Sequence, residues 1–152
     1  MTDIKRILLV EDSINDIELT LSALEENHLA NEVVVARDGQ EALDYLLRQG
    51  IYKLRAQGNP AVVLLDLKLP KVNGLEVLER LKGNPELRAV PVVMLTSSRE
   101  EQDLVRSYNL GVNAYVVKPV AFTEFVSALR DLGLFWAVIN QPPPGSVRRL
   151  GA

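Results

Sequence analysis

The chain alternates between short, uniformly apolar runs and longer segments in which apolar residues recur every three or four positions. Uniform runs rich in valine, isoleucine and leucine are typical of strands buried on both faces of a parallel sheet. The periodic segments are typical of amphipathic helices. The pattern predicts strands at residues 7–10, 32–36, 61–66, 90–96 and 114–117.

An amphipathic helix is predicted after each strand. Ser13 or Asn15 can cap the first helix, Asp38 can cap the second, and Gly111 follows the fourth as a C-terminal glycine. Residues 49–60 contain two glycines and a proline and are expected to form a longer, partly packed loop. The helices are expected at residues 13–27, 38–47, 73–82 and 100–110, and from about residue 121 onwards.

Strict alternation of strands and helices predicts an α/β fold, with a parallel sheet covered by helices on both faces. In such folds ligands bind at the carboxyl ends of the strands, where the strand order reverses. The residues that directly follow the strands are therefore the first place to look for function.

Composition narrows the chemistry. A formal net charge of -3 argues against nucleic-acid binding, and the absence of cysteine excludes disulfides and thiolate ligands. With a single histidine, the chain cannot build an all-nitrogen zinc site by itself. No apolar run reaches the roughly 18 residues needed to span a bilayer, so we expect a cytoplasmic protein that does not bind membranes.

The strand ends carry Glu11 and Asp12, Asp66, Thr96 and Lys118. Taken singly, such residues often cap helices or form turns, but together they would converge at one edge of the sheet. Two carboxylates about 5 Å apart repel by roughly 3 kcal/mol at an effective dielectric near 20, which favours a bound cation. Carboxylates, waters and phosphate oxygens suit Mg²⁺, and phosphoryl transfer needs a nucleophile, such an ion and fixed donors.

The segments ILLVED, VVLLDLKLPKVNG, VVMLTSS and AYVVKP carry a specific resemblance. From about residue 4 to 132 the chain resembles the receiver domain of bacterial two-component response regulators. The resemblance implies a flavodoxin-like (βα)5 doubly wound sandwich with strand order 2-1-3-4-5. It also implies phosphotransfer to the domain itself and autodephosphorylation, rather than an enzyme acting on outside substrates.

The resemblance implies a role for each strand-end residue. Asp66 would accept the phosphoryl group from a phosphohistidine on a sensor kinase. Glu11, Asp12 and Asp66 would hold Mg²⁺ together with the backbone carbonyl of Lys68. Glu11 stands where many members of the family have aspartate.

Three further positions follow from the resemblance. Thr96 and Lys118 would bind the phosphoryl oxygens, with Thr96 moving inward. Tyr115 occupies the position of the family's switch aromatic, and the Lys118–Pro119 peptide bond would be cis.

Rival classes share parts of this pattern. A haloacid-dehalogenase-like phosphatase would need a second aspartate two residues after the nucleophile, where this chain has Lys68. A flavodoxin-type electron carrier would need glycine- and hydroxyl-rich phosphate loops and flanking aromatics. A pseudo-receiver would lack the acceptor or metal carboxylates.

The C-terminal segment adds a second resemblance. We expect a receiver domain over residues 1–140, with a hydrophobic extension at 133–140 and a proline-containing tail at 141–152. The long loop before the third strand and the ending FWAVINQPPP together resemble the stand-alone receivers paired with bacterial phytochrome kinases. Such receivers are often dimeric through the last helix or an arm beyond it. The side chains of Phe135, Trp136 and Ile139 would then form the contact between the two subunits of a homodimer, or else pack on their own domain. Output would come from protein contacts, or from a role as phosphate sink or phosphorelay intermediate.

Overall fold

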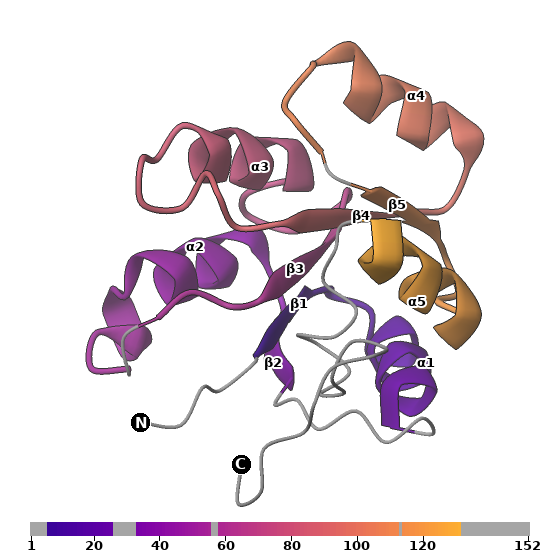
Figure 1. Ribbon diagram of the computed structural model, residues 1–152. Coiled ribbons are helices and arrows are strands. Elements are labelled where there is room, and N and C mark those ends of the chain that lie inside the picture. Colours follow the sequence, from indigo (N-terminus) through magenta and orange to yellow (C-terminus); the bar gives the residue numbers. More distant parts are fainter. Residues whose placement is uncertain (1–5, 26–32, 56–57, 113, 132–152) are drawn as a thin grey trace, which may run out of the picture.

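The computed structural model describes residues 6–25, 33–55, 58–112 and 114–131. These residues form one five-stranded parallel sheet in the order β2-β1-β3-β4-β5, with helices on both faces (Figure 1). The predicted fold class and strand order are confirmed. The strands are β1 (Ile7–Val10), β2 (Val33–Ala36), β3 (Val62–Asp66), β4 (Val92–Thr96) and β5 (Ala114–Val117).

Two apolar clusters hold the helices against the sheet. Alternate residues of each strand point to opposite faces, so Leu8 and Leu65 join one cluster and Leu9 and Leu64 join the other. The first cluster packs α2 (Gly39–Leu47), α3 (Gly74–Lys82) and α4 (Arg99–Ser107) on one face. The second packs α1 (Ile14–Glu25) and α5 (Phe122–Asp131) on the other face, around the fully buried Phe125.

Short polar side chains begin the helices where the sequence predicts it. The Asp38 carboxylate accepts a hydrogen bond from the Glu41 N–H at 2.7 Å, and Asn73 does the same for Glu76 at 3.0 Å. For the first helix, Ser13 rather than Asn15 is the cap, because its hydroxyl accepts a bond from the Asp16 N–H. These bonds satisfy N–H groups that have no partner within a helix.

Helix α4 differs from the prediction at both ends. It begins at Arg99 after the cap Ser98 and ends at Ser107, rather than spanning residues 100–110. Asn109 adopts a left-handed conformation with φ of 51°, which leads the chain out of the helix before Gly111. Asparagine tolerates this conformation better than most residues, so the helix stops earlier than a glycine rule suggests.

The loop expected at residues 49–60 contains a short 3₁₀ helix, η1 (Gly50–Tyr52). The rings of Tyr45 and Tyr52 meet edge to face at 5.1 Å, and the Arg55 side chain donates a hydrogen bond to the Tyr45 carbonyl at 2.6 Å. The loop is therefore packed onto α2. In the described part of the chain, no helix is both long and apolar enough to cross a bilayer.

Candidate phosphoacceptor and metal site

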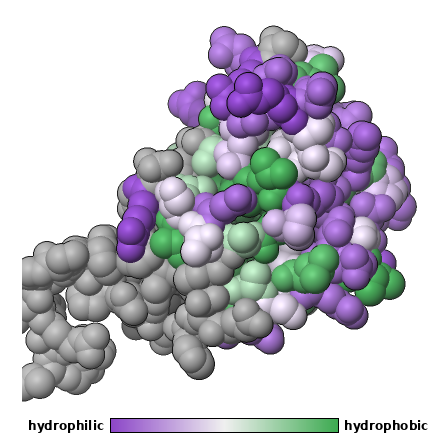
Figure 2. All heavy atoms as spheres, turned by 90° about the vertical axis from the view of Figure 1, so that its right-hand side faces the viewer, coloured by the Kyte–Doolittle hydropathy of each residue, from purple (hydrophilic) through white to green (hydrophobic). Residues whose placement is uncertain are grey.

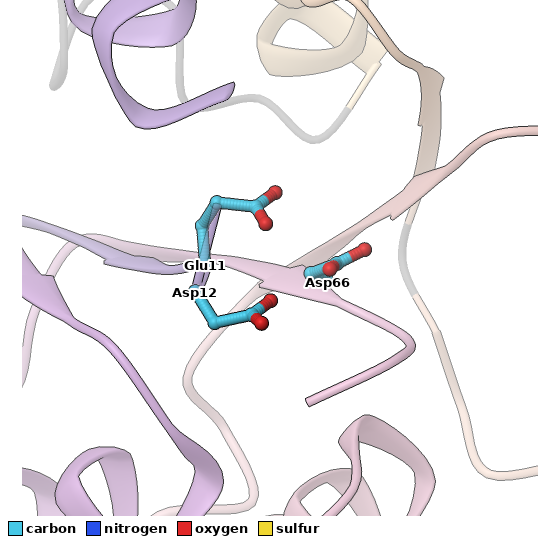
Figure 3. A group of neighbouring side chains, drawn as sticks. All are labelled: Glu11, Asp12 and Asp66. Atoms are coloured by element: carbon cyan, nitrogen blue, oxygen red, sulfur yellow. The ribbon is translucent and has the colours of Figure 1, made fainter. Parts of the chain in front are cut away.

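Three carboxylates meet at the carboxyl edge of the sheet. Glu11 and Asp12 directly follow β1, and Asp66 is the last residue of β3; in Figure 3 the side chains of Glu11 and Asp12 extend toward the side on which Asp66 lies. One oxygen from each carboxylate lies within 4.8 Å of the others. Glu11 and Asp66 are buried, whereas Asp12 is exposed and opens the cluster to solvent.

Lys118 reaches into this cluster from the residue after β5. Its Nζ lies 3.0 Å from Oε1 of Glu11, 3.2 Å from Oδ1 of Asp66 and 3.1 Å from Oδ2 of Asp16. An ammonium group has three N–H donors, and three carboxylates are available to accept them. The contact with Asp16, in the first turn of α1, was not predicted from the sequence.

The backbone around the carboxylates fixes their orientation. The Ser13 N–H donates a hydrogen bond to Oε2 of Glu11 at 3.2 Å, and the Leu67 N–H donates one to Oδ1 of Asp66 at 3.0 Å. Gly74 packs so closely under the Asp66 carbonyl that a Cβ at this position would overlap the carbonyl oxygen. The turn after β3 therefore requires glycine at the start of α3.

Burial and the neighbouring Glu11 raise the pKa of Asp66 from 3.8 to about 6, although Lys118 acts in the opposite direction. Burial also disfavours the charge on Lys118, but its hydrogen bond to Glu11 and the charge of Asp66 outweigh that effect and raise its pKa. Asp66 is therefore a buried carboxylate that is still ionised at neutral pH, held beside a permanent cation. A perturbed carboxyl group of this kind often marks a functional site.

Thr96, the last residue of β4, is fully buried, and its hydroxyl has no hydrogen-bond partner among the described residues. Buried hydroxyl groups normally find a partner, because leaving one unpaired costs about 1–3 kcal/mol. The group is a donor without an acceptor at the end of the strand next to Asp66. That arrangement suits a residue whose partner is a bound or transferred group.

Two other predicted residues lie close to the site but make separate contacts. The Lys68 side chain points to solvent and pairs with Glu101 at 3.5 Å, while the residue lines a largely apolar hollow of about 510 Å³ together with Asp12. Tyr115 is half-buried, and the Arg106 guanidinium lies 4.7 Å from the centre of its ring. Tyr115 and Arg106 line a second hollow of about 490 Å³ between α4, β5 and α5.

The Lys118–Pro119 peptide bond is cis in the structure. The predicted arm residues Phe135, Trp136 and Ile139 lie outside the described residues.

The surface beside the site is partly apolar. Ile14 is 59% exposed two residues after Asp12, and Val117 is 47% exposed directly before Lys118. Figure 2 shows hydrophobic groups among hydrophilic ones on the side of the molecule where α1, α4 and α5 lie. The site is thus bordered by side chains that could contact a protein.

The carboxylate cluster fits a divalent cation. All three donors are hard oxygen ligands, and Lys118 supplies only one positive charge against them and Asp16. Burial is the main cause of the raised pKa of Asp66, and the negative charge of Glu11 adds to it. A cation bound by Glu11, Asp12 and Asp66 would offset this repulsion.

Comparison with known proteins agrees with the geometry. The model of the response regulator receiver domain matches residues 7–130, and the chain belongs to this family. It is therefore a two-component signalling protein with a CheY-like fold, rather than an enzyme acting on outside substrates.

Its relatives include phytochrome response regulators. The bacteriophytochrome response regulator AtBRR is 68% identical, with a TM-score of 0.87 over 92% of this chain and all of that chain. Response regulator Rcp1 of Synechocystis sp. is 40% identical over 87% of this chain and 88% of its own length. A Mn²⁺-bound structure of Rcp1 has a TM-score of 0.70 and 36% identity, covering 95% of this chain and 99% of that chain. A phosphorylated phytochrome response regulator, RcpA, has a TM-score of 0.71 and 40% identity, covering 89% of this chain and 95% of that chain.

Proposed function

We propose that this protein accepts a phosphoryl group on Asp66 from a histidine kinase and thereby changes its contacts with other proteins. The observation that carries the proposal is the buried, ionisable Asp66, held 3.2 Å from Lys118 and within 4.8 Å of Glu11 and Asp12 oxygens. Phosphorylated RcpA, a relative of similar fold, supports the same chemistry.

The proposed step is a displacement at phosphorus. An oxygen of the Asp66 carboxylate attacks the phosphorus of a phosphohistidine, and the P–N bond breaks with its electron pair going to the imidazole. Asp66 becomes an acyl phosphate, while Lys118 and the Thr96 hydroxyl donate hydrogen bonds to the phosphoryl oxygens. With a pKa of about 6, Asp66 is in the nucleophilic, ionised form at neutral pH.

Glu11, Asp12 and Asp66, with the backbone carbonyl of Lys68, would hold the metal ion. We propose Mg²⁺, which neutralises charge on the phosphoryl oxygens when bound. The Mn²⁺-bound structure of the relative Rcp1 supports a divalent cation in receivers of this kind. In this chain Asp12 is exposed, on the side from which an ion would enter.

The structural change that follows phosphorylation would pass from Thr96 to Tyr115. Since the Thr96 hydroxyl has no partner among the described residues, a phosphoryl oxygen would give it one and draw it inward. Tyr115 sits on the neighbouring strand and lines the 490 Å³ hollow, so it has space to change position. A rearrangement there would alter the surface formed by α4, β5 and α5.

The donor is a protein, and we propose a bacteriophytochrome-type kinase in the cytoplasm, where ATP supplies the phosphoryl group. The support is the 68% identity with a bacteriophytochrome response regulator, together with the exposed Ile14 and Val117 beside the site. The test is phosphotransfer profiling: radiolabelled kinases are mixed with the wild type and with Asp66→Asn.

We expect rapid transfer from a phytochrome kinase to the wild type and none to the variant. Equal transfer from unrelated kinases would contradict the phytochrome assignment. Labelling of Asp66→Asn would contradict the acceptor assignment.

We further propose a homodimer formed through the C-terminal segment, on the basis of its sequence alone. Phe135, Trp136 and Ile139 are large apolar side chains, each costing roughly 1.5–3 kcal/mol to leave in water. Light scattering should give a dimer mass for the intact protein and a monomer for Trp136→Ala or for a chain lacking residues 134–152. A monomeric intact protein at high concentration would refute the dimer.

A further inference from the structure

Lys118 has a third partner outside the carboxylate cluster. Oδ2 of Asp16 lies 3.1 Å from Nζ, as close as the oxygens of Glu11 and Asp66. The cluster that could hold a cation comprises Glu11, Asp12 and Asp66 and does not include Asp16. Asp16 therefore contacts the ammonium group without belonging to the metal ligands.

Asp16 is held in place by the start of α1. Its backbone N–H donates a 3.2 Å hydrogen bond to the Ser13 hydroxyl, and the Ser13 N–H in turn bonds to Glu11. The Asp16 side chain is 30% exposed and Lys118 only 16%, so the contact lies at the outer side of a mostly buried ammonium. The helix thus fixes one acceptor while the other two lie deeper.

The three partners of Lys118 differ in what happens to them during phosphoryl transfer. Asp66 loses its carboxylate charge when it becomes an acyl phosphate, and Glu11 shares its charge with any bound cation. Asp16 is neither a nucleophile nor a member of the cation cluster, so it keeps its charge. Without it, the ammonium would be held only by groups whose charges change in the reaction.

We propose that Asp16 is a positioning residue for Lys118, which anchors the ammonium group on the α1 side so that its other N–H donors face Asp66 throughout transfer. The role in transfer rests on the function proposed above. The anchoring itself is a property of the protein without metal or phosphoryl group, and it can be measured separately.

The first measurement uses the metal-free protein. The Lys118 ammonium can be followed by its ¹⁵N NMR signal, assigned with Lys118→Arg, because hydrogen bonding slows exchange of its protons with water. We expect a clear signal in the wild type, a weaker one in Asp16→Asn and none in Asp16→Ala. Glu18→Ala, an exposed acidic residue of the same helix, is the matched control and should leave the signal unchanged.

The second measurement is the rate at which phosphoramidate phosphorylates Asp66 at saturating Mg²⁺. Loss of one charge-assisted hydrogen bond should slow Asp16→Ala about tenfold, with Asp16→Asn between it and the wild type. Glu18→Ala should react like the wild type. In a Lys118→Ala background, Asp16→Ala should have no further effect, because its action passes through the lysine.

The outcomes separate an anchor from a general charge effect. If Asp16→Asn and Asp16→Ala slow the reaction equally, or if the Asp16→Ala effect persists without Lys118, the proposal is overturned. An ammonium signal unchanged in Asp16→Ala also overturns it. If the wild type itself is not phosphorylated, the proposed function fails, whereas the NMR series still decides whether Asp16 anchors Lys118.

Discussion

Replacing Asp66 with asparagine should stabilise the metal-free protein, even though it removes the proposed phosphoacceptor. The two side chains have nearly the same shape, and asparagine keeps an oxygen to accept the hydrogen bond from the Leu67 N–H. Lys118 keeps two of its three carboxylate partners. The change therefore removes mainly a buried negative charge.

The size of the effect follows from the pKa of Asp66. Burial and Glu11 raise it from 3.8 to about 6, which shows that the native state disfavours this charge despite Lys118. The rise corresponds to about 3 kcal/mol of unfolding free energy at neutral pH. We expect Asp66→Asn to be more stable by about that amount.

The sign of the pH dependence is fixed by the same shift. Between pH 3.8 and about 6 the native state binds the proton that the unfolded chain has already released, so wild-type stability falls as the pH rises through this window. Below it Asp66 is protonated in both states, and above it the penalty is constant. The advantage of the variant should therefore be absent at about pH 4 and complete near pH 7.

The assay is urea unfolding of both proteins in EDTA across this pH range, repeated with added Mg²⁺. An ion that binds only the native state increases the free energy of unfolding by RT ln(1 + [L]/Kd). Mg²⁺ should therefore stabilise the wild type more than the variant and reduce the difference in stability between them. Equal stabilities near pH 7, or a difference that does not change with pH, would refute the reasoning.

Three further substitutions probe other parts of the site. Thr96→Val removes a buried hydroxyl that has no partner among the described residues, so it should raise the unfolding free energy by about 1 kcal/mol in urea unfolding. It should also remove the hydrogen bond from Thr96 to the phosphoryl group, which a measured phosphoryl lifetime checks. Lys118→Ala leaves the carboxylates of Glu11, Asp16 and Asp66 without their ammonium partner, so it should lower the unfolding free energy in EDTA by about 3–5 kcal/mol. Added Mg²⁺ should restore part of this loss, and an unchanged melting temperature would show that Lys118 does not offset the carboxylate charge. Gly74→Ala forces a Cβ against the Asp66 carbonyl and should lower the unfolding free energy by about 3 kcal/mol. Gly83→Ala should lower it much less, because the nearest atom to a Cβ there lies at 3.2 Å. Equal losses of stability in thermal unfolding would contradict the close packing of Gly74.

The sheet and the strand-end carboxylates could be predicted because they depend on local patterns. Uniform apolar runs place the strands, and the topology of a parallel sheet then brings residues 11, 12, 66, 96 and 118 to one edge. The cap Asp38 follows from its residue type and its position before an amphipathic segment.

The contact between Asp16 and Lys118 could not be predicted in the same way. It depends on where the first turn of α1 lies relative to the end of β5, and no local pattern links two residues that are 102 positions apart in the chain. One signal was available: Asp16 lies in the first turn of the helix that directly follows the strand end carrying Glu11 and Asp12. The early end of α4 at Ser107 was missed for a different reason: Asn109 already adopts a left-handed conformation, two residues before Gly111, which has a positive φ as well.

The most direct test of the account is to locate the phosphoryl group. The wild type and Asp66→Asn are incubated with a phosphorylated kinase and Mg²⁺, the acyl phosphate is reduced with borohydride, and the modified residue is mapped by mass spectrometry. The account predicts one modified residue, Asp66, in the wild type and none in the variant. Modification of another residue, or equal phosphorylation of both proteins, would contradict it.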